Sequence, residues 1–95
     1  FKLEADLFLN LSSLNTLYLN NNLLRKIEPL YLIKKLENLD LANNFIKSVN
    51  ITNNLKTLNL ANNYFLTDLK TVDQKLIRLN LNMCFRLNST FPIEN

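Results

Sequence analysis

The nine residues L-E-N-L-D-L-A-N-N, at Leu36–Asn44, form a pattern that recurs along the chain. It has leucine at its first, fourth and sixth positions and asparagine at its ninth. Similar stretches begin at Leu14, Leu55 and Leu76, so the four copies start 22, 19 and 21 residues apart. A period of about twenty residues predicts an architecture built from one repeated structural unit.

The centre of each copy alternates between apolar and polar side chains, as in Leu39, Asp40 and Leu41. Alternation with a period of two predicts a short strand that has one buried face and one solvent face. A strand of about five residues cannot bury its leucines alone, so successive copies must stack beside one another. Each copy runs in the same direction and returns through a long connection, so the stacked sheet must be parallel.

The ninth position of each copy lies where the chain leaves the strand and turns inward. Backbone N–H and C=O groups there have no partner in the sheet, and a buried carboxamide can donate and accept at once. The sequence therefore predicts a column of hydrogen-bonding side chains between neighbouring turns, formed by Asn22, Asn44, Asn63 and Cys84. Cys84 supplies only a weak thiol donor in the fourth copy.

These residues resemble the L-x-x-L-x-L-x-x-N/C phrase of the leucine-rich repeat family, which matches in all four copies. The resemblance covers most of the chain. It implies an α/β solenoid, a right-handed superhelix with a short-stranded parallel β-sheet on its concave side. The convex side is expected to hold irregular or 3₁₀ segments, because repeats this short cannot support full helices. The family is used mainly to bind other macromolecules.

The resemblance implies a single leucine-rich repeat domain, residues 1–95. The tail of a preceding repeat and four repeats then divide it into 1–13, 14–35, 36–54, 55–75 and 76–95. The spacing of Phe8, Leu11 and Leu14 resembles the end of a repeat of the longer, extracellular type, and a free N-terminal cap is the alternative. The end of a repeat without its beginning predicts a fragment of a longer solenoid.

The segments that return from one copy to the next also carry a pattern. In the first repeat, apolar residues fall three apart at Leu24, Ile27, Leu30 and Ile33, which predicts an irregular or 3₁₀ path with these side chains inward. Glu28-Pro29 is expected to open a short helical turn with Pro29 at its first position. In the third repeat we expect Phe65, Leu69 and Val72 to face inward.

Composition argues against several classes of protein. The net charge is +3, but Lys and Arg are scattered rather than clustered, so no nucleic-acid footprint is expected. One cysteine and no histidine leave almost no ligands for a transition metal, and no cofactor is expected. No apolar run approaches the ~18 residues of a membrane span. The carboxylates are spread over different faces, so we expect no catalytic site and no enzyme.

The solvent-facing strand positions and the position just after the first strand form the candidate partner-binding face. They are Thr16, Tyr18, Asn20, Asn38, Asp40, Thr57, Asn59, Arg78 and Asn80. Tyr and Arg contribute most to binding energy when an interface buries them. The alternative is that these are ordinary solvated strand positions.

Three glycosylation sequons begin at Asn10, Asn50 and Asn88, and we expect all three on return segments or corners rather than on strands. With the Phe8 spacing, they favour a secreted or cell-surface protein of the receptor, adhesion or innate-immunity type that binds a protein partner. The 22-residue first repeat resembles the intracellular subclass, so a cytoplasmic regulatory scaffold is the alternative. A structural spacer, in contact with neighbouring repeats of a longer chain, is the third interpretation.

Overall fold

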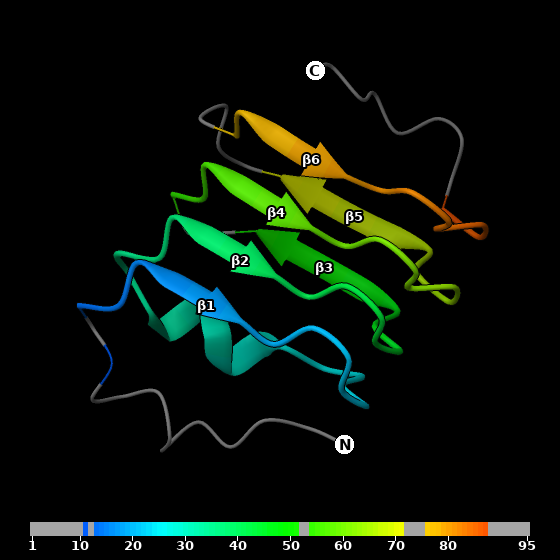
Figure 1. Cartoon of the computed structure of the whole chain (residues 1–95), viewed down its shortest axis with the longest axis horizontal. Helices are drawn as coiled ribbons and strands as arrows, with labels where there is room; N and C mark the ends of the chain where they lie inside the picture. Colours follow the sequence, from blue (N-terminus) through cyan, green and yellow to red (C-terminus); the bar gives the residue numbers. More distant parts are fainter. Residues whose placement is uncertain (1–10, 12, 52–53, 72–75, 88–95) are drawn as a thin grey trace.

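The chain alternates between two β-sheets, each of which consists of parallel strands (Figure 1). The computed structural model describes residues 11, 13–51, 54–71 and 76–87. One winding consists of a strand of the larger sheet and the segment that returns to the next such strand. We call the larger sheet the main sheet and the smaller one the second sheet.

The main sheet has four strands in the order β1-β2-β4-β6, all parallel. They are β1 (Thr16–Tyr18), β2 (Asn38–Asp40), β4 (Thr57–Asn59) and β6 (Arg78–Asn80). The register pairs equivalent positions, so Leu17, Leu39, Leu58 and Leu79 lie side by side. The predicted short parallel strands are therefore confirmed.

The second sheet joins β3 (Ser48–Ile51) to β5 (Asp68–Thr71), again in parallel. The first winding has the 3₁₀ helix η2 (Glu28–Leu32) on this side instead, with Pro29 in its first turn. Proline has no N–H to donate to a neighbouring strand but suits the start of a helix, so Pro29 favours a helix over a strand at this position. The helical turn at Glu28-Pro29 is confirmed. The expectation of irregular or 3₁₀ segments on this side is wrong for the second and third windings, because their return segments pair as β3 and β5.

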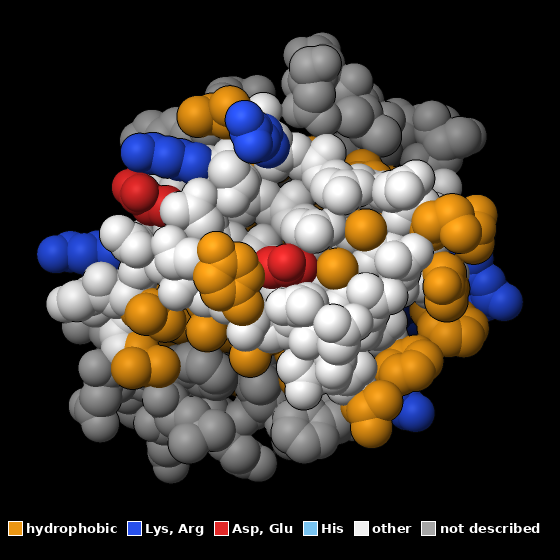
Figure 2. All heavy atoms as spheres, in the orientation of Figure 1, with side chains coloured by type: hydrophobic (Ala, Val, Ile, Leu, Met, Phe, Trp, Pro, Cys, Tyr) orange, Lys and Arg blue, Asp and Glu red, His pale blue; other side chains and the backbone are white. Residues whose placement is uncertain are grey.

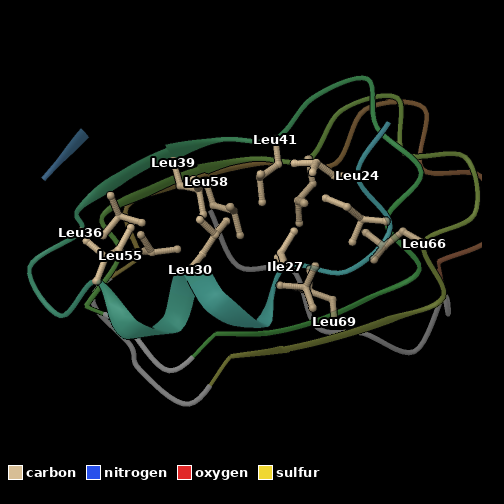
Figure 3. Packing of buried hydrophobic residues seen from close by; sticks show 14 residues of the cluster. Leu24, Ile27, Leu30, Leu36, Leu39, Leu41, Leu55, Leu58, Leu66 and Leu69 are labelled. Atoms are coloured by element: carbon tan, nitrogen blue, oxygen red, sulfur yellow. The ribbon is translucent and has the colours of Figure 1, made fainter. Parts of the chain in front are cut away.

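The hydrophobic core lies between the main sheet and the return segments, where side chains from both sides point toward one another (Figure 3). Burying one such side chain contributes about 1.5–3 kcal/mol. The buried cluster is Leu24, Ile27, Leu30, Ile33, Leu36, Leu39, Leu41, Ile46, Val49, Leu55, Leu58, Leu60, Leu66 and Leu69. The three-residue spacing predicted for the first return segment is confirmed by the burial of its four members.

The prediction that Phe65 faces inward is wrong, because the third winding has one more residue in its turn. One residue lies between Asn44 and the buried Ile46, but two lie between Asn63 and the buried Leu66. The extra residue forms a tight turn in which the Leu66 N–H donates to the Asn63 carbonyl at 3.2 Å. Phe65 is left 42% exposed.

The other two inward positions of that prediction have different outcomes. Leu69 is buried, as expected. Val72 lies outside the described residues.

The turns that follow the main-sheet strands use left-handed backbone. Positive φ angles of 59–65° occur at Asn21, Asn43, Asn62 and Met83. The chain contains no glycine, and asparagine is the residue that tolerates this conformation best after glycine. Each of these asparagines precedes a position of the predicted column. In the pairs Asn43-Asn44 and Asn62-Asn63 the first residue turns the backbone and the second is buried in the core.

Candidate functional site

The asparagine column holds neighbouring windings together through buried hydrogen bonds. Asn44 is 3% exposed; its Oδ1 accepts from the Leu24 N–H at 3.0 Å, and its Nδ2 donates to the Leu19 carbonyl at 3.1 Å. Asn63 is fully buried and repeats the arrangement one winding on, with bonds of 3.1 Å from the Ile46 N–H and 3.0 Å to the Leu41 carbonyl. Each carboxamide thus joins two windings.

The two ends of the column are weaker. Asn22 is exposed, and its Nδ2 donates to the Leu19 and Asn20 carbonyls of its own turn at 3.0 and 3.3 Å. Cys84 is half-buried, and its Sγ donates to the Leu60 carbonyl at 3.0 Å. Burial raises the pKa of the Cys84 thiol, which keeps it protonated and able to donate.

The main sheet presents two rows of side chains on its solvent face. The register aligns Thr16, Asn38, Thr57 and Arg78 in one row and Tyr18, Asp40, Asn59 and Asn80 in the other. Together these eight residues line a hollow of about 470 Å³. Figure 2 looks onto this side and shows mostly polar and backbone atoms over its centre. Eight of the nine predicted face residues therefore share one surface.

The ninth predicted residue, Asn20, does not line the hollow. It lies just past the end of β1, is half-buried, and uses its carbonyl to accept from Asn22.

Side-chain hydrogen bonds run along the first row. The Asn38 Nδ2 donates to the Thr16 Oγ1 at 3.2 Å, and the Thr57 Oγ1 donates to the Asn38 Oδ1 at 2.8 Å. Three strands are thus linked through their side chains as well as their backbones. These bonds restrict the orientations of the three side chains.

Side-chain oxygens in the second row stabilise the turns that follow their strands by accepting hydrogen bonds from backbone N–H groups. Asp40 Oδ1 accepts from the Ala42 N–H at 3.0 Å, Asn59 Oδ1 from the Ala61 N–H at 3.0 Å, and Asn80 Oδ1 from the Asn82 N–H at 2.9 Å. Asp and Asn characteristically bond the backbone two residues ahead in this way. We did not predict this role from the sequence, although the recurrence of Asp or Asn at the last strand position indicates it.

Tyr18 and Arg78 make no side-chain hydrogen bond or ion pair with another described residue. Tyr18 occupies the second-row position of β1, where the other strands have a turn-fastening Asp or Asn, and it is 72% exposed. Arg78 is exposed in β6, at the opposite edge of the main sheet. A large amphipathic ring and a guanidinium therefore lie at opposite edges of the main sheet, one in each row.

The structure describes one of the three sequon asparagines. Asn50 is exposed in β3, and its N–H donates to the Tyr31 hydroxyl at 2.9 Å. The expectation that all three sequons avoid strands is wrong for Asn50, because the return segment that carries it pairs with the next one. Asn10 and Asn88 lie outside the described residues.

Within the described ranges, no three His, Cys, Asp or Glu side chains come close enough to hold a metal ion. A search of the same residues finds no helix with the length and hydropathy that crossing a bilayer requires.

Comparison with known proteins gave no match to a family model, a curated protein or a solved structure.

Proposed function

We propose that the chain is a segment of a leucine-rich repeat solenoid that binds a partner protein through its main sheet and catalyses no reaction. In this proposal the windings form a right-handed superhelix, and the main sheet is its concave side. Four aligned copies of the leucine phrase and the buried bonds of Asn44 and Asn63 support the family assignment.

The observation that carries the binding proposal is the fixed arrangement of the solvent face. The bonds from Asn38 to Thr16 and from Thr57 to Asn38 hold the first row in place, so little side-chain freedom is lost when a partner docks. Tyr18 and Arg78 belong to the residue types that dominate interface energies. Their strands, β1 and β6, lie three strand spacings apart, about 14 Å at ~4.8 Å per strand, which suits two anchors of one partner surface.

We also propose a secreted or cell-surface location. Asn50 is exposed on the second sheet, away from the hollow of the main sheet, and it begins an Asn-Ile-Thr sequon. A glycan at Asn50 would project from the return side and leave the proposed binding face open.

A pair of matched triple variants tests the binding face. The face variant combines Tyr18→Ala, Asp40→Asn and Arg78→Ala, where Asp40→Asn removes the charge but keeps the acceptor that fastens the turn. The control makes the same kinds of change at exposed positions elsewhere, Phe85→Ala, Asp68→Asn and Lys70→Ala.

Each immobilised chain is incubated with a mixture of extracellular proteins, and the captured proteins are quantified. The proposal expects a protein that the wild type and the control retain and the face variant loses. Capture that is the same for all three chains would favour the spacer interpretation.

Endoglycosidase treatment tests the location. The chain is secreted from eukaryotic cells behind an added signal peptide, alongside an Asn50→Gln variant. A mass loss in the wild type that is smaller in the variant supports the extracellular proposal. No mass loss at any sequon would favour the cytoplasmic scaffold.

A further inference from the structure

A second hollow, of about 580 Å³, lies where the turns after the main-sheet strands lead into the second sheet. Its apolar part is formed by Phe45 and Phe65, which are 41% and 42% exposed and have ring centroids 6.3 Å apart. Four basic residues, Arg25, Lys26, Lys47 and Arg86, also line it. We call this site the aromatic groove.

The extra residue in the third winding creates the aromatic groove. It turns Phe65 out of the core and beside Phe45 of the preceding winding. Arg86 of the next winding places its guanidinium 5.1 Å from the Phe65 ring centroid, a cation–π contact. Figure 2 shows hydrophobic side chains following one another along the edge of the molecule on the right of the view, with basic side chains beside them.

Although Lys and Arg are scattered along the sequence, the fold brings four of them together in this groove. Of the 11 basic and 8 acidic residues of the chain, four basic residues and one acidic residue, Glu28, line it. The remaining seven of each sign cancel, so the groove accounts for the whole net charge of +3. Among the described residues the one ion pair joins Lys56 to Glu37 at 3.4 Å, so no described carboxylate pairs with the four cations.

We propose that the aromatic groove binds an acidic peptide segment of a partner protein. An aliphatic or aromatic side chain of the peptide packs on Phe45 and Phe65, and peptide carboxylates pair with Arg25, Lys47 and Arg86. Charge complementarity identifies this occupant: an apolar floor beside four cations that no described carboxylate pairs with is matched by a segment that alternates carboxylates with an apolar residue. The site is separate from the hollow of the main sheet, because the two share no lining residue.

A single-stranded nucleic acid fits the groove less well. Base stacking needs an aromatic ring with an open face. Arg86 covers one face of Phe65, and the Phe45 and Phe65 rings are tilted by 31° to each other, so they offer no parallel platform. The neighbouring Tyr64 and Phe85 rings stack on one another, 5.8 Å apart and 11° from parallel.

Fluorescence anisotropy with defined probes tests the proposal. The main probe is a labelled peptide of glutamate and aspartate with one central leucine. The comparison probes are the same peptide with alanine for leucine, a lysine-rich peptide, a short oligothymidine, and phosphatidylserine vesicles measured by co-sedimentation. We expect the leucine peptide to bind tightest, and added salt to weaken it. Preferred binding of oligothymidine or vesicles, or equal binding of the alanine peptide, would overturn the proposal.

Matched variants locate the binding site. The double variant Lys47→Glu/Arg86→Glu should weaken the leucine peptide about tenfold or more. The control Lys34→Glu/Lys35→Glu changes the net charge equally at exposed positions outside the groove and should change the affinity about twofold or less. Phe65→Ser should also weaken binding, whereas Phe85→Ser, outside the groove, should not. Equal losses in variants and controls would contradict the assignment.

A measurement on the wild type covers the case in which a variant does not fold. Intermolecular nuclear Overhauser effects from the peptide leucine methyl groups should reach the Phe45 and Phe65 rings. Contacts to Tyr18 instead would place the peptide on the main sheet and refute the groove. Because the two surfaces share no residue in these tests, one proposal can fail while the other stands.

Discussion

Replacing Asn44 with alanine removes one buried carboxamide, and the structure shows which backbone groups lose a partner. The Leu24 N–H loses its acceptor outright. The three carbonyls that Asn44 serves each keep another donor: Leu19 keeps Asn22 Nδ2 at 3.0 Å, Leu41 keeps Asn63 Nδ2 at 3.0 Å, and Ala42 keeps the Asn21 N–H at 2.9 Å. The cost is therefore set by one orphaned buried N–H.

An unsatisfied buried donor costs about 1–3 kcal/mol, so Asn44→Ala should lower the free energy of unfolding by that amount. Asn22→Ala is the matched control, because Asn22 is exposed and bonds only its own turn. It should change the free energy by about 0.5 kcal/mol or less. Urea unfolding followed by circular dichroism measures both. Equal effects of the two substitutions would refute the reasoning.

The double variant Asn44→Ala/Asn63→Ala makes the test sharper. The Leu41 carbonyl accepts from Asn44 Nδ2 and from Asn63 Nδ2, each at 3.0 Å. Each single variant leaves it one donor, and the double variant leaves it none. The double variant should therefore lower the free energy of unfolding by about 1–2 kcal/mol more than the sum of the two single variants. Strict additivity in the unfolding data would mean that the two side chains do not share this carbonyl.

Three further predictions concern other parts of the fold. Leu66→Ala should lower the free energy of unfolding by about 2–5 kcal/mol and Phe65→Ala by under about 1 kcal/mol, measured by thermal unfolding. The reverse order would contradict the claim that an inserted turn residue places Leu66 in the core and Phe65 outside it. Met83→Asn should raise the free energy of unfolding by about 0.5–1 kcal/mol, because Met83 has a φ of 65° and asparagine tolerates left-handed backbone better than methionine. A lower melting temperature would contradict this. Burial, and to a lesser degree Glu28, raises the pKa of Tyr31 above 10.0, although the Asn50 N–H opposes this. Folding therefore favours the neutral phenol, so the contribution of Tyr31 to the free energy of unfolding should be lost as pH rises above about 10. If Tyr31→Phe leaves the pH dependence of that free energy unchanged, this prediction is wrong.

The main sheet was predictable because its determinants are local. Leu39, Asp40 and Leu41 set the alternation, and Asn44 closes the phrase at a fixed distance. The helix η2 was predictable for a similar reason, since Pro29 is decisive within its own turn. The second sheet was not, because it depends on the return segments pairing Val49 with Leu69 across two windings.

The candidate site was predicted in position but not in its internal bonding. Alternation places Tyr18, Asp40 and Arg78 on one face, and the register confirms that they share it. That Asp40 fastens its own turn depends on the backbone geometry at Ala42. The aromatic groove was missed because one inserted residue decides it: with Leu66 in the core, Phe65 must lie outside.

Amide hydrogen exchange at Leu24 and Ile46 tests most directly the claim that buried asparagines join the windings. Both N–H groups donate to a column carboxamide, at 3.0 and 3.1 Å. They should exchange about as slowly as global unfolding allows, and Asn44→Ala should remove the protection of Leu24 while Ile46 keeps its own. Rapid exchange of Leu24 in the wild-type chain, at the rate of an unprotected amide, would contradict the account.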